Sequence, residues 1–375
     1  MTWGEKITAS NTYILMYTTS SDGGSTWDVP TAINSAVNVQ LTGINIAGDS
    51  ADKLWLVAGI MDVAAGTYDV KIWTKAAGGA WDGGTVLWDG SVLGGNCVAP
   101  TIAISSTDIV WVSCHRLVGA DYIIKVKYYD GGWSAEETID GGIMCGGTCI
   151  CIDDVDVPHV VYHRLSAAKY YPYYTNRSGG AFAAGTLLDG DATAHKLYPT
   201  VCMNSDGDLF VAYQGKRAGD LADQIYVVVK PSGGAWGAPA ILSDDTANAC
   251  ENVAIGYDDT GAVWVAWLQR GAVQDIIARK WNGAGWDAQA IIYNGAALST
   301  AWYIDAVCTK YPTFSNPSVG FALVYGVDAN ASEYYGSDGL TWPGPAPGGG
   351  ARHPAYKKPL HVTPLTGRRP FGPEY

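Results

Sequence analysis

Short runs in which apolar and polar residues alternate fill most of the chain, and no stretch shows the 3.6-residue period of an amphipathic helix. These runs occur in pairs. Examples of the first run are "LWLVAG", "VWVSCHR", "HVVYHR" and "VWVAW", and examples of the second are "YDVKIWTK", "YIIKVKYY" and "QIYVVVK". Glycine, aspartate and serine separate the runs, as expected of tight turns. The pattern predicts an all-β protein built from short strands.

Each second run leads into a glycine-rich turn that closes with an aromatic residue. Such turns recur about fifty residues apart, and a regular period of this length is typical of a repeat architecture. Their closing residues are Trp27, Trp81, Trp133, Phe182, Trp236, Trp286 and Trp342. An apolar segment precedes each pair of runs, and a short polar run follows each turn. Four strands in each unit predict a β-propeller with four-stranded antiparallel blades.

The ends of the repeat leave the number of blades open between six and seven. There are seven third-strand turns but only six pairs of first and second strands. Residues 11–32 would supply a third and a fourth strand, and residues 302–325 would supply inner strands. Joining these two half-blades would close the ring and remove its open sheet edges, which favours six blades. Seven blades are the alternative, with Thr2–Ala9 as an additional rim strand.

The first of the turns, "SSDGGSTW", contains a recognisable motif. Its residues Ser20, Asp22, Gly24, Thr26 and Trp27 match the pattern Ser-x-Asp-x-Gly-x-Thr-Trp, which resembles the Asp-box of sialidase-like (BNR-repeat) propellers. The resemblance implies a structural turn between the third and fourth strands, with the tryptophan packed between blades. Sialidases of this family also need an arginine triad and an N-terminal Arg-Ile-Pro motif. That motif does not occur here and only nine arginines are present, so sialidase activity is not predicted.

Charged and imidazole side chains recur just after the second strands, and they are the candidate ligand-binding residues. They are His115, Arg116, His163, Arg164, Arg217 and Arg270. Strands of a propeller alternate in direction, so these residues should share the face opposite the Asp-box turns. Guanidinium and imidazole groups beside tyrosines can bind carboxylated or hydroxylated sugars. In the alternative interpretation, which the repetition favours, each arginine bridges to a carboxylate or carbonyl of the neighbouring blade. No catalytic residue is assigned.

The recurring aspartates and cysteines fit structural roles better than metal binding. The turns between first and second strands contain Asp153, Asp154, Asp156, Asp206, Asp208, Asp258 and Asp259, but none has the ligand set of a calcium loop, and Asp-Gly is common in hairpins. The segment "CGGTCIC" holds Cys145, Cys149 and Cys151, and Cys202 occupies an equivalent place in the next unit. We interpret them as reduced packing residues. A disulfide among Cys97, Cys145 and Cys250 is the alternative. No metal and no other cofactor is predicted.

The overall charge and the N-terminus restrict the partners and the location. A formal net charge of −13 argues against nucleic-acid binding, which needs a basic surface. Residues 1–30 show no basic segment followed by an apolar run, so no signal peptide is predicted, and no window is apolar enough to insert into a membrane. We therefore expect synthesis in the cytoplasm and a final location in a virion or another assembled particle.

The propeller is expected to span residues 1–342, and residues 343–375 form a different unit. This segment contains 8 of the 17 prolines and is basic, whereas the rest of the chain is acidic. Such composition predicts an extended arm that docks onto a neighbouring protein subunit. Its candidate docking residues are Arg352, Tyr356, Lys357, Lys358, Arg368, Arg369, Phe371 and Tyr375.

Together these features predict a non-enzymatic structural or adhesion propeller, a subunit of a larger assembly of the phage virion or tail type. The arm would dock the subunit, and one face of the propeller would meet a glycan or a protein. The alternative is a polysaccharide-active enzyme, a lyase or a glycoside hydrolase, that uses the histidines and arginines at 115–116 and 163–164 with Tyr162. A soluble lectin is a further alternative.

Overall fold

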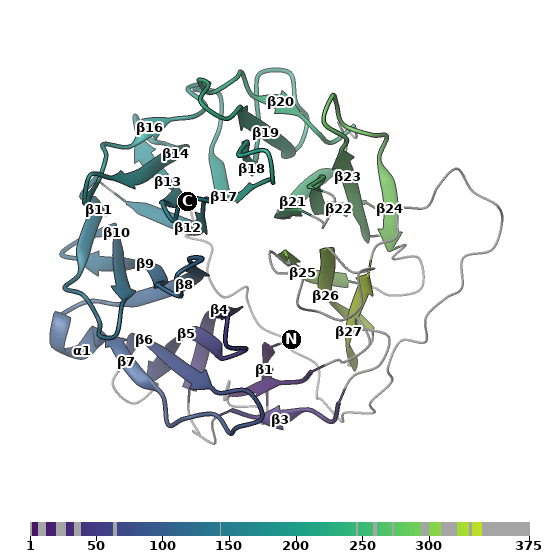
Figure 1. The fold of residues 1–375 in the computed structure, drawn as a ribbon. Helices are drawn as coiled ribbons and strands as arrows, with labels where there is room; N and C mark the ends of the chain where they lie inside the picture. The colour runs from purple at the N-terminus through teal and green to yellow at the C-terminus, as the bar shows by residue number, and fades with distance from the viewer. Residues whose placement is uncertain are drawn as a thin grey trace.

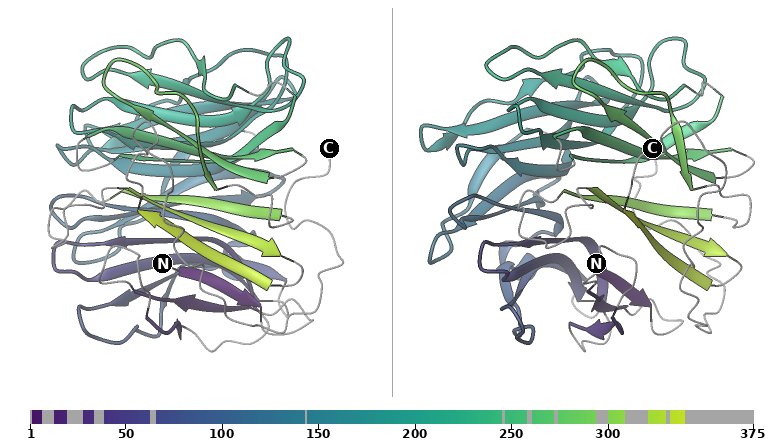
Figure 2. Two further views of the ribbon diagram at one scale, coloured as in Figure 1. Left: turned by 90° about the vertical axis from the view of Figure 1, so that its right-hand side faces the viewer. Right: turned by 45° about the vertical axis from the view of Figure 1, so that its right-hand side comes forward.

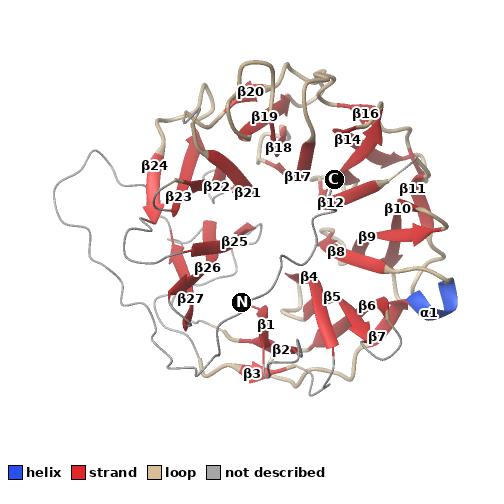
Figure 3. Cartoon of the chain, turned by 180° about the vertical axis from the view of Figure 1, so that it is seen from behind, coloured by secondary structure: helices blue, strands red, loops and turns tan. Residues whose placement is uncertain are grey.

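The chain folds almost entirely into β-strands arranged as a ring of sheets around a central axis (Figure 1). The computed structural model describes residues 2–6, 13–19, 28–33, 39–62, 66–142, 144–244, 247–257, 261–271, 274–293, 300–308, 321–329 and 332–339. Within these residues a short turn of helix, α1 (Gly90–Leu93), is the only helix, and it lies outside the ring (Figure 3). No described helix is long and apolar enough to cross a membrane.

Five consecutive sheets, blades B to F, form the regular part of the ring. Blade B contains β4 (Val39–Gly48), β5 (Leu54–Asp62), β6 (Thr67–Lys75) and β7 (Thr85–Trp88). Blade C contains β8 (Cys97–Ile104), β9 (Val110–Val118), β10 (Asp121–Tyr129) and β11 (Glu137–Asp140). Blade D contains β12 (Cys145–Ile152), β13 (Pro158–Ser166), β14 (Lys169–Ser178), β15 (Ala181–Phe182) and β16 (Thr186–Leu187). Blade E contains β17 (Lys196–Met203), β18 (Leu209–Gly215), β19 (Gln224–Lys230) and β20 (Ala240–Ile241). Blade F contains β21 (Ala249–Tyr257), β22 (Val263–Arg270), β23 (Gln274–Trp281) and β24 (Ala290–Tyr293).

The two ends of the chain form separate three-stranded sheets, which differs from the expected joined blade. The N-terminal sheet contains β1 (Thr2–Lys6), β2 (Tyr13–Tyr17) and β3 (Thr31–Ala32), and the C-terminal sheet contains β25 (Thr300–Cys308), β26 (Phe321–Ala329) and β27 (Ser332–Gly339). The physical reason is that β1 pairs antiparallel with β2 along its whole length and so satisfies the edge that the C-terminal strands were expected to cover. The two end sheets are neighbours in the ring (Figures 1 and 2).

The innermost strand of each of blades B to F contains a bulge, because the register against the second strand shifts at the same place in every one. One residue of each bulge has a left-handed backbone with φ between 47° and 56°. These residues are Gly43, Ala99, Gly147, Tyr198 and Asn252. A bulge bends its strand and redirects the side chains around it. The bend therefore lets the five innermost strands pack around the central axis.

Aromatic residues of the repeated turns pack between blades, as the repeat predicts. The ring of Trp236 lies edge-on to Tyr174 of the preceding blade, with centroids 4.8 Å apart, and Trp286 lies against Phe210 at 6.2 Å. The described cysteines are free and at least partly buried within these layers, which agrees with a packing role. The Asp-box at Ser20–Trp27 and the arm at 343–375 lie outside the described residues, so their roles stay predictions.

The bulge at Gly43 yields a test of how closely neighbouring blades approach. A Cβ atom at Gly43 would lie 2.4 Å from the backbone Cα of Ala99 in the next blade, whereas a Cβ at Gly131 would meet nothing within 4 Å. Both glycines have positive φ. We expect Gly131→Ala to lower the free energy of unfolding by about 1–2 kcal/mol through backbone strain alone, and Gly43→Ala to lower it by more. Urea unfolding monitored by tryptophan fluorescence measures both; equal losses would contradict the close approach.

Candidate active site

Two of the predicted arginines link neighbouring blades through a buried carboxylate. Arg164 of blade D donates from Nη1 to Asp140 of blade C at 2.9 Å, and its guanidinium lies 4.0 Å from the ring centroid of Tyr173. Arg217, which follows β18 in blade E, pairs with Asp189 at the end of blade D at 3.1 Å. These contacts correspond to the structural interpretation of the repeated arginines.

The other two arginines also have acidic partners, but within their own blades. Arg116 donates to Glu136 at 2.8 Å, and Glu136 accepts a second ion pair from Lys125 at 3.0 Å. Arg270 forms an ion pair with Glu251 on the adjacent strand. The structure thus places all four guanidinium groups in ion pairs. Their role as ligand-binding groups stays a prediction.

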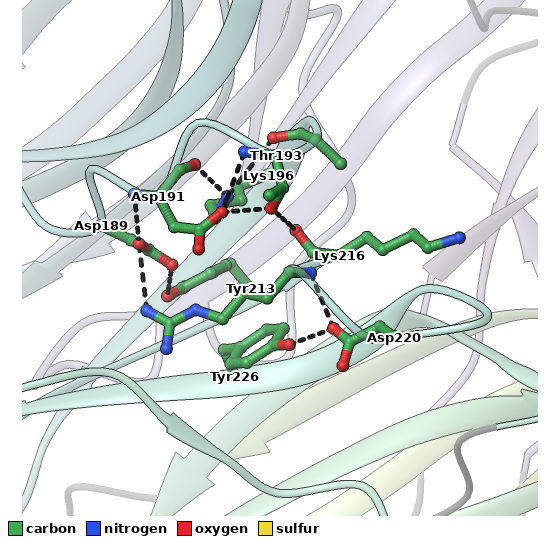
Figure 4. Close-up of polar contacts among 10 residues, drawn as sticks. Asp189, Asp191, Thr193, Lys196, Tyr213, Lys216, Asp220 and Tyr226 are labelled. Atoms are coloured by element: carbon green, nitrogen blue, oxygen red, sulfur yellow. Dashed lines mark hydrogen bonds and ion pairs between the residues drawn. The ribbon is translucent and has the colours of Figure 1, made fainter.

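A buried tyrosine strengthens each of the two links between blades. The Tyr162 hydroxyl donates to Asp140 at 2.7 Å. The Tyr213 hydroxyl donates to Asp189 at the same distance, as Figure 4 shows for this second pair. Neither tyrosine has any exposed surface. Burial, followed by the contact with the carboxylate, raises the pKa of both phenols far above the ordinary value for tyrosine. Tyr162 is therefore a structural hydrogen-bond donor and is unsuited to proton transfer at neutral pH.

The histidine at position 163 belongs to a cluster that the sequence did not predict as a whole. This His–tyrosine cluster consists of His163 on β13, Tyr170 on β14, His195 just before β17, and Tyr198 on β17. The His163 ring lies edge-on to Tyr170, with centroids 5.0 Å apart, and to Tyr198, with centroids 5.6 Å apart. Tyr170 lies 5.5 Å from His195. The cluster therefore joins blades D and E on the face where second and third strands connect.

Backbone N–H groups fix the tautomer of both imidazoles in the cluster. The Tyr198 N–H donates to Nδ1 of His163 at 3.3 Å, and the Tyr170 N–H donates to Nδ1 of His195 at 3.2 Å. A neutral imidazole that accepts on Nδ1 bears its proton on Nε2. His163 Nε2 has no hydrogen-bond partner among the described residues. The proton of His163 therefore lies on Nε2, as an N–H donor that no described residue uses.

Burial keeps His163 neutral. Its side chain lies against the backbone of Gly146 and Gly147, where an added Cβ would come within 2.8 Å and 2.7 Å of the ring nitrogens. Burial, with smaller contributions from His115 and His195, lowers the pKa of His163 to about 3. In blade C the equivalent His115 packs edge-on to Tyr122 at 5.5 Å, and burial lowers its pKa to about 4. Any larger residue at the two glycines of "CGGTC" would clash with the imidazole that packs against them.

Tyr198 is the exposed member of the cluster and has an unusual backbone. It occupies the bulge position with φ of 51°, which is uncommon for a residue with a bulky side chain, and it remains 43% exposed. The other described blades place glycine, alanine or asparagine there. Strained backbone conformations are concentrated at functional sites, so a tyrosine at this position marks the cluster as a candidate active site.

The aspartate-rich turns lie at the other ends of the strands, on the opposite face. Asp153 Oδ1 accepts the N–H groups of Val155 at 3.0 Å and Val157 at 2.6 Å within its own turn. Asp156 accepts the N–H of Ser106 at 2.6 Å and its hydroxyl at 2.8 Å, so this contact links blade D to blade C. Asp153 thus stabilises its own turn, and Asp156 joins two blades.

The remaining aspartates of these turns add no metal site within the described residues. Asp154 and Asp206 line a pocket of about 270 Å³, which is smaller than most small-molecule sites. Asp208 accepts a backbone N–H from the turn after β19 at 2.8 Å. Among the residues that the structure describes, no group of three His, Cys, Asp or Glu side chains is arranged to hold a metal ion. Residues 258–259 lie outside them.

Solved structures resemble this fold. No protein-family model matches the chain, and no curated protein is significantly similar to it. A protein of unknown function from Dyadobacter fermentans superposes with a TM-score of 0.59 at 12% identity, over 80% of this chain and 94% of that one. An ulvan lyase of polysaccharide lyase family PL25 gives 0.53 at 13% identity, over 78% and 80%. The polysaccharide lyase Uly1 gives 0.54 at 10% identity, over 90% and 86%. The chain thus shares its propeller fold with glycan-active proteins.

The link at Asp140 yields a prediction about stability. Replacing Asp140 by alanine leaves the buried Tyr162 hydroxyl without its acceptor, which we expect to lower the free energy of unfolding by about 1–3 kcal/mol. The matched change Asp154→Ala removes an exposed carboxylate and should alter it by less than about 0.5 kcal/mol. Urea unfolding compares the two. A loss at Asp140 no larger than the loss at Asp154 would show that the link contributes nothing.

The low pKa of His163 yields a prediction about pH. Since the folded-state pKa lies below the unfolded value, the unfolded chain binds the proton first, and this contribution to stability is complete above about pH 6.5. It is lost progressively as the pH falls from about 6.5 towards about 3, by up to about 1.4 kcal/mol per pH unit. Histidine-ring NMR at pH 5 should find His163 and His115 still neutral, while the urea-unfolded chain titrates normally. A protonated His163 at that pH would refute the assignment.

Proposed function

We propose that this protein binds acidic polysaccharides and cleaves them by β-elimination at the His–tyrosine cluster. One observation carries the proposal: a neutral imidazole, His163, presents an unpaired Nε2–H beside Tyr198, which is exposed and held in a strained conformation. A hydrogen-bond donor next to an exposed phenol is the pair of groups that β-elimination of a uronic acid requires. The proposal corresponds to our alternative prediction, and it replaces Tyr162 by Tyr198 as the reacting tyrosine.

In the proposed reaction, a uronate unit loses the proton on the carbon next to its carboxylate. The electron pair of that C–H bond forms a C=C bond, the C–O bond to the neighbouring sugar breaks, and the departing oxygen takes up a proton. Negative charge develops on the carboxylate, where the His163 Nε2–H can donate to it. The Tyr198 hydroxyl is exposed enough to take up the carbon-bound proton as phenolate and to return one to the leaving oxygen.

Three carboxylates near the cluster are engaged by other side chains, which makes them poor candidates for the carboxyl pair of a hydrolase. Glycoside hydrolases generally use two carboxyl groups on either side of the scissile bond. In the described part of the chain, Asp140 and Asp189 are each held by an arginine and a tyrosine hydroxyl, and Asp191 contacts Lys196. These groups are occupied by structural contacts. Tyr198 is the exposed group of the cluster, and the buried His163 imidazole packs beside it.

The fold neighbours agree with this proposal without establishing it. Two of the three structures described above are named as polysaccharide lyases, at 13% and 10% identity. Similarity at this level concerns the fold, and function depends on the site. The structural-subunit hypothesis depends on the arm at 343–375, which lies outside the described residues, and no described contact favours it over catalysis.

Substitutions in the cluster test the proposal. On a panel of acidic polysaccharides, the wild type should generate unsaturated products that absorb in the ultraviolet. We expect Tyr198→Phe and His163→Gln each to lower kcat/KM by about 10²–10⁴-fold, because each removes a group that moves or stabilises charge in the transition state. Tyr129→Phe is the matched control. Tyr129 is the last residue of β10 in blade C and is not part of the cluster, so this variant should retain full activity.

Two outcomes would refute the proposal. New reducing ends without ultraviolet absorbance would identify a hydrolase. Absence of product from every acidic polysaccharide, with a correctly folded protein, would leave the cluster without this chemistry.

A further inference from the structure

Lys196 departs from the repeat in a way that packing does not explain. It occupies the second residue before the bulge of β17, the position of Cys97, Cys145 and Cys250 in blades C, D and F. Its side chain is completely buried. A buried ammonium group is unfavourable unless hydrogen bonds replace its water. Blades C, D and F have a cysteine at this position. A lysine here therefore indicates a function that those blades lack.

The chain segment before β17 winds around the ammonium group. Lys196 Nζ donates to the carbonyl oxygen of Asp191 at 2.5 Å, to the carbonyl oxygen of Ala194 at 3.3 Å, and contacts Asp191 Oδ1 at 3.4 Å. The same Asp191 carboxylate accepts the N–H and the hydroxyl of Thr193 (Figure 4). One cation thus contacts three acceptor atoms of two residues, Asp191 and Ala194, in the segment that connects blades D and E.

The residue that pairs with Lys196 on the neighbouring strand is a glycine, which leaves room for the lysine side chain. Gly215 pairs with Lys196, and an added Cβ there would lie 2.8 Å from the Lys196 Cγ atom. In blades C and D the same pair consists of a cysteine and an arginine, namely Cys97 with Arg116 and Cys145 with Arg164. In blade E the paired residue is a glycine, and the first strand contains a cation, Lys196, that faces the segment before β17.

That segment ends in His195, which contacts the His–tyrosine cluster. His195 lies between Ala194, whose carbonyl binds the ammonium, and Lys196 itself. Its Nδ1 accepts the Tyr170 N–H at 3.2 Å, and Tyr170 packs edge-on to His163 at 5.0 Å. We propose that Lys196 is a positioning residue that holds His195 against Tyr170 and thereby fixes the cluster across the junction of blades D and E. Its effect on catalysis rests on the proposed function.

Charged groups from three elements face His195 and make its titration a direct probe. Burial lowers the pKa of His195, Lys169 on β14 and Lys196 on β17 lower it further, and Asp223 before β19 raises it. Removing the Lys196 charge and releasing the segment should both move the pKa of His195 upward towards the ordinary histidine value. This change is visible by NMR whether or not a substrate is known.

The experiment uses the full chain with Lys196→Met, which keeps an unbranched side chain of similar length and removes the ammonium. We expect the His195 pKa to rise and the Tyr170 and His163 ring signals to shift. On a polysaccharide that the wild type cleaves, kcat should fall by about ten- to a hundredfold with a smaller change in KM. The double variant Lys196→Met/His195→Gln should be no slower than His195→Gln alone, since Lys196 acts through His195.

Two further variants keep the outcome interpretable. Lys230→Met removes a lysine from the opposite face and should change neither the His195 titration nor the rate. If Lys196→Met does not fold, Lys196→Cys/Gly215→Arg restores the pair found in blades C and D and should fold with a shifted His195. A folded variant with unchanged His195 titration, or rate losses that add in the double variant, would overturn the proposal. A wild type that cleaves no polysaccharide would reject the proposed function, and the NMR comparison would still decide the role of Lys196.

Discussion

The bend in the innermost strands is the constraint on which the rest of this structure depends. Straight strands cannot converge on an axis without clashing, and each described blade from B to F relieves this with one left-handed residue at the same place. At the bend, the N–H group of the left-handed residue itself points away from its own sheet. In blade E that group belongs to Tyr198 and donates to His163 of blade D. A feature required for packing thus also sets the protonation of the imidazole at the candidate active site.

Contacts between side chains also join one blade to the next. The carboxylates of Asp140 and Asp189 each accept a hydrogen bond from a buried tyrosine and an ion pair from an arginine of the following blade. These links pair the charges of Arg164 and Arg217 with carboxylates. Among the described members of the cluster, the polar groups left for a ligand are a neutral N–H and a phenol.

Sequence reasoning reached the architecture because the repeat displays it directly. The spacing of turns closing at Trp133 and Trp236, with alternating strands before them, is determined by local geometry that a sequence shows. The repeated arginines were also found, together with the interpretation that they bridge blades. Tyr198 and His195 were missed because a left-handed backbone is invisible in sequence and their partners lie on another blade. An alignment of the innermost strands would have given a signal, since Tyr198 and Lys196 replace small residues in that register.

The separate sheets at the two ends have a consequence for how this ring can change over time. In the described residues, the N-terminal and C-terminal strands pair only within their own sheets, so no hydrogen-bonded ladder crosses the seam between them. Duplication or deletion of one terminal unit would leave every remaining ladder intact. Propellers that close by sharing a blade between both ends cannot gain or lose a unit so simply. This seam is therefore the place where the lineage of the protein has the greatest freedom to alter the size of its ring.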